Sequence, residues 1–372
     1  MTSNQLGVQT GKRIGLMTSG GDCAGLNAAI RAVVRRAIHG YGWTVIGIKD
    51  GSAGLMARPV EAEELTLLSV GGDLIRRGGT ILGTINKGDP FAYKMADGSV
   101  VDRSGEVVEG LRQLSLDALI VIGGDGSMRL LSRLCQLGNI PMIGIPKTID
   151  NDVAETEYAI GFDTAVSVAC EALDRLAPTA ASHHRVMILE VMGRDVGHIA
   201  LTAGVSGGAD VILIPEIPYS LTGIANRLQT VSARGRKHAL LVVAEGCGTE
   251  TGDKVTQDRD GGRARYGGIG QYLAERLEDL IEAEIRVTVL GHVQRGGMPS
   301  MRDRMIASAF GVRAVDLIAQ GGADLVVVWK NGDVDDVPLS HVAGQTRAVD
   351  PDGTMVKTAK GLGLYVGNDS SA

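Results

Sequence analysis

Residues 118–127 read Ala118-Leu-Ile-Val-Ile-Gly-Gly-Asp-Gly-Ser127, an unbroken aliphatic run followed by a glycine turn that contains a carboxylate. An aliphatic run of this length is typical of a strand buried on both faces of a parallel sheet. A second run, Ile140-Pro-Met-Ile-Gly-Ile145, leads into Pro146-Lys-Thr-Ile-Asp-Asn-Asp152. Open α/β sheets form phosphate and metal sites in the loops at the carboxyl ends of their strands. The two loops therefore predict an α/β protein that carries out phosphoryl transfer.

Short aliphatic runs alternate with longer segments of helical spacing along the whole chain. The runs that we expect to be strands are 13–17, 45–48, 118–122, 142–145, 186–191, 211–214, 240–243, 287–290 and 325–329. The segments that we expect to be helices are 26–39, 128–137, 165–176, 224–233, 269–283 and 305–320. This alternation predicts mainly parallel sheets covered by helices. Polar residues 89–108 predict a hairpin or loop insertion, and residues 246–266 predict a surface loop.

The composition limits the classes of partner. The chain has 372 residues, 44% of them hydrophobic, which is enough for two domains or one large domain. Its formal net charge is -6 and only 3% of its residues are aromatic, so we expect neither nucleic acid nor an anionic membrane as a partner. Four cysteines without CxxC spacing indicate a reducing compartment. Residues 1–10 lack the apolar core of a signal peptide, and no apolar run would span a bilayer, so we expect a cytoplasmic protein.

Two glycine-rich turns each precede a helical segment. The first, at 18–27, matches neither the dinucleotide fingerprint nor the P-loop, but a glycine loop that opens a helix still offers N–H groups to an anion. The second contains Asp125, and magnesium phosphate sites commonly use only one or two carboxylates. Ordinary turn glycines and an Asx-turn aspartate are the alternative for these loops.

The Thr148-Ile-Asp-Asn-Asp152 motif is the sharpest chemical signal. Phosphorylation of a hydroxyl requires a group that accepts its proton, and either aspartate is suited to this role while the other positions it or stays near a metal. A helix cap or turn cluster is the alternative.

The second half of the chain supplies cations at strand ends, namely Arg185, Arg194, Arg286, His292 and Arg295. Arginine binds phosphoryl oxygens with two parallel hydrogen bonds, and His adds another donor. Each arginine alone is more often a surface ion-pair residue, but together in a net acidic chain they indicate an anionic substrate. Glu245, at the end of its own strand, is suited to accept hydrogen bonds from sugar hydroxyls or is a solvated turn residue.

With these residues assembled, the chain resembles the 6-phosphofructokinase family from about residue 13 to residue 345. The motifs that carry the resemblance occur in the family's order at 19–22, 77–80, 123–127, 148–152, 190–194 and 291–297. The resemblance implies a glycolytic kinase that transfers a phosphoryl group from ATP, with Mg²⁺, to the 1-hydroxyl of fructose 6-phosphate, giving fructose 1,6-bisphosphate. It implies a cytoplasmic homo-oligomer, a dimer or commonly a tetramer, whose subunits contain two similar three-layer α/β domains with the active site in the cleft between them.

The expected division assigns 1–161 and 294–345 to a donor domain and 162–293 to a sugar-phosphate domain. Residues 346–372 are expected to form a C-terminal segment that packs on the body, with a frayed end.

The resemblance also implies a role for individual residues. The implied donor-site residues are Gly21, Lys87, Gly124, Asp125, Gly126 and Ser127, with Asp125 as the Mg²⁺ ligand. Asp150 is the implied base, and the other implied catalytic residues are Lys147, Thr148, Asp152 and Arg194. The implied sugar-phosphate residues are Thr148, Ile149, Asp150, Met192, Gly193, Arg194, Glu245, His292, Val293, Gln294 and Arg295. Arg185 and Arg286 complete that set and are implied to reach it from a neighbouring subunit.

Three positions bear on the phosphoryl donor. Lys147 stands where typical bacterial ATP-dependent members carry Gly and where pyrophosphate-dependent and mixed-donor members carry Lys. Gly126 stands where pyrophosphate-dependent members carry Asp, a carboxylate that would repel and block the α-phosphate of ATP. Asn86 replaces an arginine of the ATP enzymes, and Lys87 is the nearby cation. This combination resembles the ATP-using branch of the mixed-donor subgroup, and a pyrophosphate-dependent fructose-6-phosphate 1-phosphotransferase is the alternative.

The resemblance extends in part to regulation. Arg31 and Arg35 match two effector-site arginines of allosteric bacterial members, whereas Ala177 stands where a further effector arginine would be. Losing one phosphate contact is expected to weaken or abolish such control. A non-catalytic sugar-phosphate or nucleotide sensor on the same fold is a third hypothesis, but such a sensor has no need of a base.

Overall fold

The computed structural model describes residues 11–86, 88–257 and 265–367, and the chain divides into two compact units. Unit 1 contains 1–147, 153–160 and 301–345, and unit 2 contains 148–152, 161–300 and 346–372. The expected division differs at 148–152, 161 and 294–300, which lie in unit 2. The reason is local bonding, since Arg347 holds the 148–152 turn and the Gln294 side chain bonds to Met192 and Ala165.

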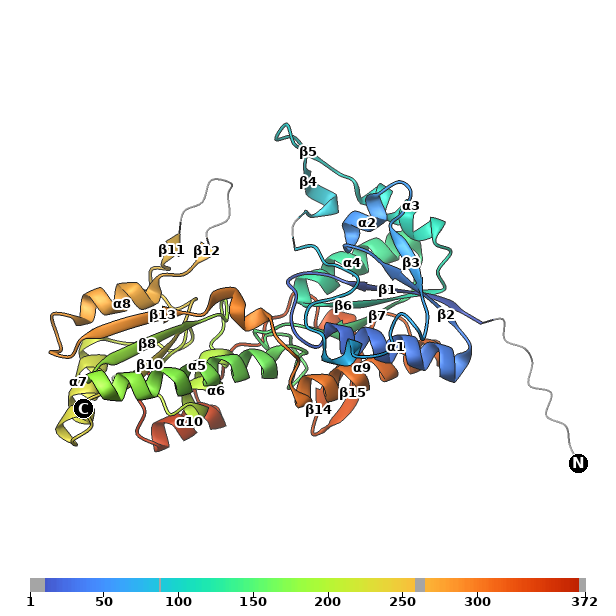
Figure 1. The fold of residues 1–372 in the computed structure, drawn as a ribbon. Helices are drawn as coiled ribbons and strands as arrows, with labels where there is room; N and C mark the ends of the chain where they lie inside the picture. The colour runs from blue at the N-terminus through green and yellow to red at the C-terminus, as the bar shows by residue number, and fades with distance from the viewer. Residues whose placement is uncertain (1–10, 87, 258–264, 368–372) are drawn as a thin grey trace, which may run out of the picture. The chain divides into compact units, whose positions relative to one another are not determined.

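Unit 1 is built on a seven-stranded sheet. The strand order is β15 (Asp333–Pro338), β14 (Leu325–Lys330), β7 (Met142–Pro146), β6 (Ala118–Gly123), β1 (Arg13–Thr18), β2 (Thr44–Ile48) and β3 (Ala62–Leu65). The two edge strands, β3 and β15, are antiparallel to their neighbours, and the other pairs are parallel. Helices α1 (Leu26–Tyr41) and α9 (Met301–Ala319) pack together on one face, and α2 (Ser52–Met56), α3 (Ser104–Gln113) and α4 (Asp125–Gly138) cover the other (Figure 1).

The aliphatic run of β6 is buried on both faces, as its sequence predicts. Leu119 and Val121 join a core cluster with residues of α3 and α4, among them Leu111 and Leu134. The alternate β6 residues are also fully buried. Because successive side chains of a strand point to opposite faces, helices must cover both sides of this strand.

Unit 2 has a four-stranded parallel sheet in the order β13 (Ile285–Val289), β8 (Val186–Val191), β10 (Ala239–Ala244) and β9 (Val211–Leu213). Helices α5 (Phe162–His183) and α6 (His198–Ser206) lie on one face and α8 (Ile269–Leu277) on the other, where it contacts α7 (Leu221–Ala233) (Figure 1). The C-terminal helix α10 (Thr354–Gly361) packs against α6, and Tyr365 pairs with Val211 beside β9.

Every strand and helix expected from the sequence is present, and the α/β prediction is confirmed. The expected insertion at 89–108 is a hairpin of β4 (Tyr93–Lys94) and β5 (Val100–Val101), but the prediction missed that α3 begins at Ser104. The helix forms because Val107 and Leu111 reach the core. In the expected loop 246–266, β11 (Thr256–Gln257) pairs with β12 (Arg265–Tyr266), and 258–264 lie outside the described residues. Four short 3₁₀ turns complete the described elements: η1 (Leu74–Arg76), η2 (Pro90–Ala92), η3 (Gly291–Arg295) and η4 (Leu339–His341).

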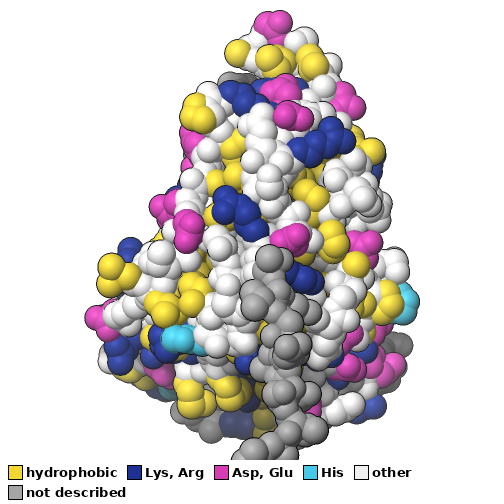
Figure 2. Space-filling model, turned by 90° about the vertical axis from the view of Figure 1, so that its right-hand side faces the viewer, with side chains coloured by type: hydrophobic (Ala, Val, Ile, Leu, Met, Phe, Trp, Pro, Cys, Tyr) yellow, Lys and Arg dark blue, Asp and Glu magenta, His cyan; other side chains and the backbone are white. Residues whose placement is uncertain are grey.

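Charged side chains of both signs lie on the described surface. On the face shown in Figure 2, basic, acidic and apolar side chains are interspersed. Among the described residues, no helix combines the length and the apolar character that a bilayer-crossing segment needs.

The contact between α1 and α9 predicts a stability effect at Gly311. A Cβ at Gly311 would lie 2.7 Å from the Cβ of Ala32 and 2.9 Å from the carbonyl oxygen of Ala29. We predict that Gly311→Ala lowers the free energy of unfolding by about 1–3 kcal/mol, because the helix backbones must move apart. Gly105→Ala is the matched control, since a Cβ on this α3 glycine would have nothing within 4 Å. Equal urea-unfolding midpoints for the two variants would contradict the close packing.

Candidate active site

In unit 1, the amino end of α4 faces the carboxyl edge of the sheet. Gly124 precedes the helix in an extended conformation, and the first helical hydrogen bond runs from Met128 N to Gly124 O at 2.9 Å. The backbone N–H groups of Asp125, Gly126 and Ser127 therefore have no acceptor within the helix. These donors and the positive end of the helix dipole form a local environment that favours an anion.

Three segments meet beside this helix end. Gly20 has a φ of 88°, and a Cβ there would lie 3.1 Å from Ser127 Oγ and 3.2 Å from Lys147 Nζ. The Lys147 ammonium donates a hydrogen bond to the carbonyl oxygen of Gly21 at 2.6 Å. The structure thus brings together Gly21 and Ser127, which are expected at the donor site, and Lys147, which is expected to be catalytic.

A further segment lies against the Gly20 turn. Gly20 N donates to Ile85 O at 2.9 Å, and Thr84 Oγ1 donates to Gly20 O at 2.7 Å. Asn86 directly follows these contacts in the chain, and Lys87 lies outside the described residues. The expected donor role of Lys87 therefore stays a prediction.

Gly126 borders open space. The residue is exposed, and a Cβ there would meet no atom within 4 Å. A side chain at 126 would therefore project into open space rather than into the protein.

Asp125 supplies one carboxylate in the first turn of α4. Within residues 11–86, 88–257 and 265–367, no three His, Cys, Asp or Glu side chains gather into a metal-binding group. The donor set fits Mg²⁺ held by one carboxylate together with phosphate oxygens, which is the arrangement that this ion prefers.

In unit 2, a tight turn buries the Asp150 carboxyl group. Thr148 Oγ1 accepts a hydrogen bond from Asp150 N at 3.1 Å, and Ile149 is buried beside it. Asp150 is only 8% exposed, and its Oδ1 has no hydrogen-bond partner in the described part of the chain. A buried carboxylate oxygen without a partner is costly, and such atoms call for an explanation in function.

The surroundings of Asp150 change its acidity. Burial raises the pKa of Asp150 to about 7, and the nearby carboxylate of Asp152 acts in the same direction. The guanidinium groups of Arg295 and Arg194 oppose this shift, and Glu245 adds to it. An Asp with a pKa near neutrality is suited to general-base catalysis.

The carboxyl ends of β8 and β10 are joined directly. Arg194 N donates to Glu245 Oε1 at 3.3 Å, and a Cβ at Gly246 would lie 1.6 Å from the carbonyl oxygen of Arg194. Only a glycine at 246 permits this approach. Burial raises the pKa of Glu245, and the backbone N–H of Arg194 opposes the shift.

The end of β13 contributes the 3₁₀ turn η3. Gln294 is buried, and its Oε1 accepts a hydrogen bond from Met192 N at 2.7 Å. His292 and Val293 are exposed, and Arg295 is close enough to Asp150 to affect its pKa. The expected sugar-phosphate residues at 148–152, 192–194, 245 and 292–295 therefore form one group at the carboxyl edge of this sheet.

Arg185 and Arg286 lie at the opposite edge. Arg185 precedes β8 and Arg286 is the second residue of β13, whereas the group around Asp150 follows the ends of these strands. Both arginines pair with Glu284. The structure thus does not bring them to Asp150 within this chain.

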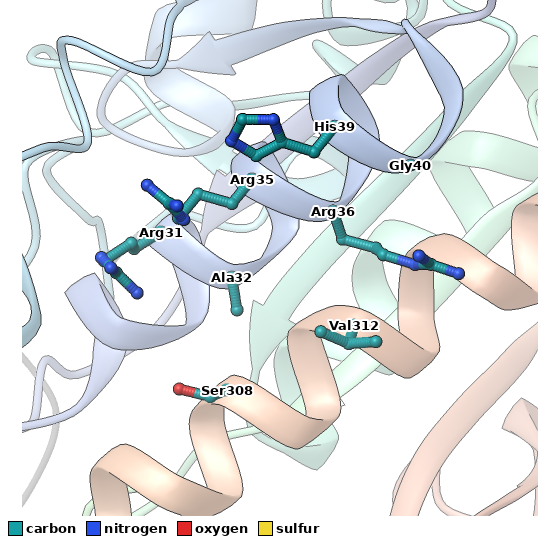
Figure 3. Close-up of a pocket in the computed structure, with 8 residues that line it drawn as sticks. All are labelled: Arg31, Ala32, Arg35, Arg36, His39, Gly40, Ser308 and Val312. Carbon is teal, nitrogen blue, oxygen red and sulfur yellow. The ribbon is translucent and has the colours of Figure 1, made fainter.

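A separate pocket of about 330 Å³ lies between α1 and α9 (Figure 3). Arg31, Arg35, Arg36 and His39 line its α1 side. Arg36 is paired with Asp316 at 2.6 Å, whereas Arg31 and Arg35 have no ion-pair partner in the described part of the chain. Four basic side chains around one pocket suit an anion. Ala177, at the position that lacks the third arginine, lies on α5 in unit 2.

Sequence reasoning missed two residues near the Asp150 turn, Arg347 and His198. Arg347 donates hydrogen bonds to the carbonyl oxygens of Asn151 and Asp152, and the His198 ring bonds to the carbonyl oxygen of Arg347. These contacts are with backbone atoms, so no side-chain motif reveals them.

The chain is similar to known proteins along most of its length. A family model described as phosphofructokinase matches residues 13–318. ATP-dependent 6-phosphofructokinase 1 of Synechocystis sp. is 57% identical over 358 residues, which is 96% of this chain and 99% of the relative. The protein of the same name from Nostoc sp. is 57% identical over 356 residues, again 96% of this chain and 99% of the relative.

Solved structures agree with this similarity. Phosphofructokinase from Saccharomyces cerevisiae superposes with a TM-score of 0.74 at 31% identity, over 88% of this chain and 45% of the yeast chain. The present chain thus spans less than half of the yeast chain. A pyrophosphate-dependent phosphofructokinase from Marinobacter aquaeolei has a TM-score of 0.76 at 23% identity, over 96% of this chain and 89% of that one, which is a likeness of fold.

The buried Asp150 carboxyl group predicts a pH-dependent stability difference. Its pKa is about 7 in the folded protein and near 4 in an unfolded chain, so the folded state loses stability as the pH rises from about 4 through 7. Asp150→Asn removes this titration. We predict that the stability of the variant relative to the wild type increases by about 2–3 kcal/mol between pH 5 and pH 8, as measured by urea unfolding. A constant difference across that range would contradict the raised pKa.

Proposed function

The chain belongs to the phosphofructokinase family, and we propose that it transfers the terminal phosphoryl group of ATP to the 1-hydroxyl of fructose 6-phosphate. The product is fructose 1,6-bisphosphate, and the reaction is the glycolytic one. The relatives that match at 57% identity are named as ATP-dependent enzymes, which supports ATP as the donor.

The observation that carries the proposal is the buried Asp150 carboxyl group with an unpartnered oxygen. A hydroxyl that attacks phosphorus must lose its proton, and a base with a pKa of about 7 is about half deprotonated at neutral pH. Asp150 accepts this proton as the new O–P bond forms. A protein that only senses a sugar phosphate has no use for such a group, since its burial costs stability.

The donor residues of unit 1 hold the phosphates of ATP. The N–H groups at the start of α4 bind phosphate oxygens, Gly21 and Gly124 allow the backbone to come close, and Lys147 offsets negative charge. Asp125 is the residue that would hold Mg²⁺, together with the phosphates. When bound, this ion neutralises charge on the donor phosphates.

The acceptor residues of unit 2 hold fructose 6-phosphate. Met192, Gly193 and Glu245 bind the sugar, with Met192 fixed by its bond to Gln294. His292 and Arg295 bind the 6-phosphate, and Val293 lies between them in the same turn. Arg194 stabilises the charge on the transferring phosphoryl group. Thr148 and Asp152 support Asp150, and buried Ile149 excludes water beside it.

The two remaining arginines point to an oligomer. Arg185 and Arg286 carry cations at an edge that the acceptor residues of the same chain do not share. We propose that they serve the 6-phosphate site of a neighbouring copy in a homo-oligomer, a dimer or a tetramer, and that they then leave their ion pairs with Glu284. As a glycolytic enzyme, the protein acts in the cytoplasm.

Replacing the base tests the proposal directly. We predict that Asp150→Asn lowers kcat with ATP by about 10²–10⁴-fold, because proton transfer loses its acceptor. Fructose 6-phosphate should still bind, with a calorimetric Kd within about threefold of the wild-type value. Coupled assays of fructose 1,6-bisphosphate formation measure the first effect. Near-normal turnover in the variant would refute Asp150 as the base.

A second variant tests the choice of donor. Lys147 is the residue that favours the alternative phosphoryl donor, pyrophosphate. Initial rates with ATP and with pyrophosphate are therefore compared at saturating fructose 6-phosphate. We predict that ATP is the better donor and that Gly126→Asp lowers kcat/KM for ATP by about 100-fold, since its carboxylate faces the phosphates. Gly126→Asn is the matched control of equal size without the charge, and should lose much less.

Both the Asp and the Asn side chain fit at position 126, because a Cβ there would meet no atom within 4 Å. Turnover with pyrophosphate alone would overturn the choice of donor. Equal losses in the Asp and Asn variants would show that size, not charge, limits the site.

A further inference from the structure

The segment 346–349 lies against the turn that carries Asp150. Arg347 contacts it twice, since its backbone N–H donates to Asp152 O at 2.7 Å and its Nη2 donates to Asn151 O at 2.8 Å. One residue, distant in the sequence, thus binds the carbonyl oxygens of both residues that follow Asp150.

The bound turn has an unfavourable backbone conformation. Asn151 has a φ of 54°, in the left-handed region, and is 4% exposed. Most residues other than glycine occupy this region at a cost of about 1–2 kcal/mol, and asparagine enters it more readily than the others, so the turn tolerates Asn151 at a modest cost. The two hydrogen bonds from Arg347 hold the peptide units on both sides of Asp152. The first of these units starts at Asn151, the residue bonded to Asp150, so its position affects the direction of the Asp150 side chain through one intervening residue.

Arg347 is itself fixed to helix α6. His198, the first residue of α6, lies 3.0 Å through its Nε2 from the carbonyl oxygen of Arg347. Burial lowers the pKa of His198 to about 4, so the neutral ring must carry its proton on Nε2 to donate to a carbonyl. Glu216 Oε1 provides a second link, since it accepts hydrogen bonds from Val349 N at 2.8 Å and from Gly197 N at 3.0 Å.

We propose that Arg347 is a positioning residue for the reaction, which aligns the Asp150 carboxylate with the acceptor hydroxyl by clamping the Asn151 and Asp152 carbonyls. This inference rests on the proposed function, because it concerns the base of that reaction. Arg347 does not contact substrate in this account. Arg347 acts on Asp150 only through the 148–152 turn. His198, through its hydrogen bond to the Arg347 carbonyl, fixes Arg347 relative to α6.

The test compares kcat and KM in variants of the full chain. A base displaced by a fraction of an ångström slows the chemical step while substrate binding is largely kept, and such displacements cost up to about 100-fold. We predict that Arg347→Met lowers kcat by about 10–100-fold, with KM for both substrates within about threefold of wild type. Arg347→Lys keeps a donor that reaches a carbonyl oxygen and should recover part of the loss.

Tyr365→Phe is the matched control. Tyr365 belongs to the same C-terminal segment, and its hydroxyl accepts a hydrogen bond from Ser220 N at 3.1 Å, away from the Asp150 turn. This variant weakens the docking of the segment without touching Arg347. We expect the Tyr365→Phe variant to have the wild-type kcat. All variants are assayed at a temperature at which their thermal melts show them to be folded. An equal loss of kcat in Tyr365→Phe and Arg347→Met would reduce the role of Arg347 to general stability and refute the inference.

A second pair of variants keeps the test decisive if Arg347→Met does not fold. His198→Leu removes the donor to the Arg347 carbonyl, whereas His198→Gln retains an amide donor. The leucine variant should lose kcat at nearly constant KM, and the glutamine variant should lose less. If Asp150→Asn is inactive but Arg347→Met and His198→Leu turn over at wild-type kcat, this inference falls and the proposed function stands. If Asp150→Asn is active, the assignment of the base itself fails.

Discussion

The burial of the Asp150 carboxyl group is the constraint on which the proposed reaction depends. One of its oxygens is buried without a partner among the described residues, and Asp152 stands nearby with a second negative charge. Such a group is unfavourable for folding, so the surrounding bonds must hold it. Arg194 and Arg295 offset part of the charge, and Arg347 donates hydrogen bonds to the carbonyl oxygens of Asn151 and Asp152. The result is a carboxyl group that titrates near neutral pH.

The carboxyl edge of the sheet in unit 1, which we propose to bind the donor, relies on a different kind of group. Its anion-binding groups are chiefly backbone N–H donors at the start of α4, with the Lys147 ammonium close to the same turn. Backbone donors are fixed by the fold and need no reorganisation when a phosphate binds. Lys147 and Thr148 are consecutive residues but belong to different units.

Much of the fold and part of the site follow from the sequence, because both rest on local patterns. Aliphatic runs predict buried strands, and a loop at the end of such a run predicts where Asp125 and Asp150 lie. Arg347 and His198 could not be predicted, because their partners are backbone carbonyls, which every residue has. Arg347 and Asn151 also lie nearly 200 positions apart in the sequence. Helix α3 was missed because its polar first turn, beginning at Ser104, hides the buried face.

The most direct test of the central claim is the titration of Asp150 in the free protein. Carbon-13 NMR of protein labelled at the aspartate carboxyl carbons, compared with Asp150→Asn, identifies the signal of this one group. The account predicts a carboxyl resonance that titrates with a pKa of about 7 and is missing from the variant. A difference spectrum in which the Asp150 signal titrates below pH 5, as an exposed aspartate does, would contradict it.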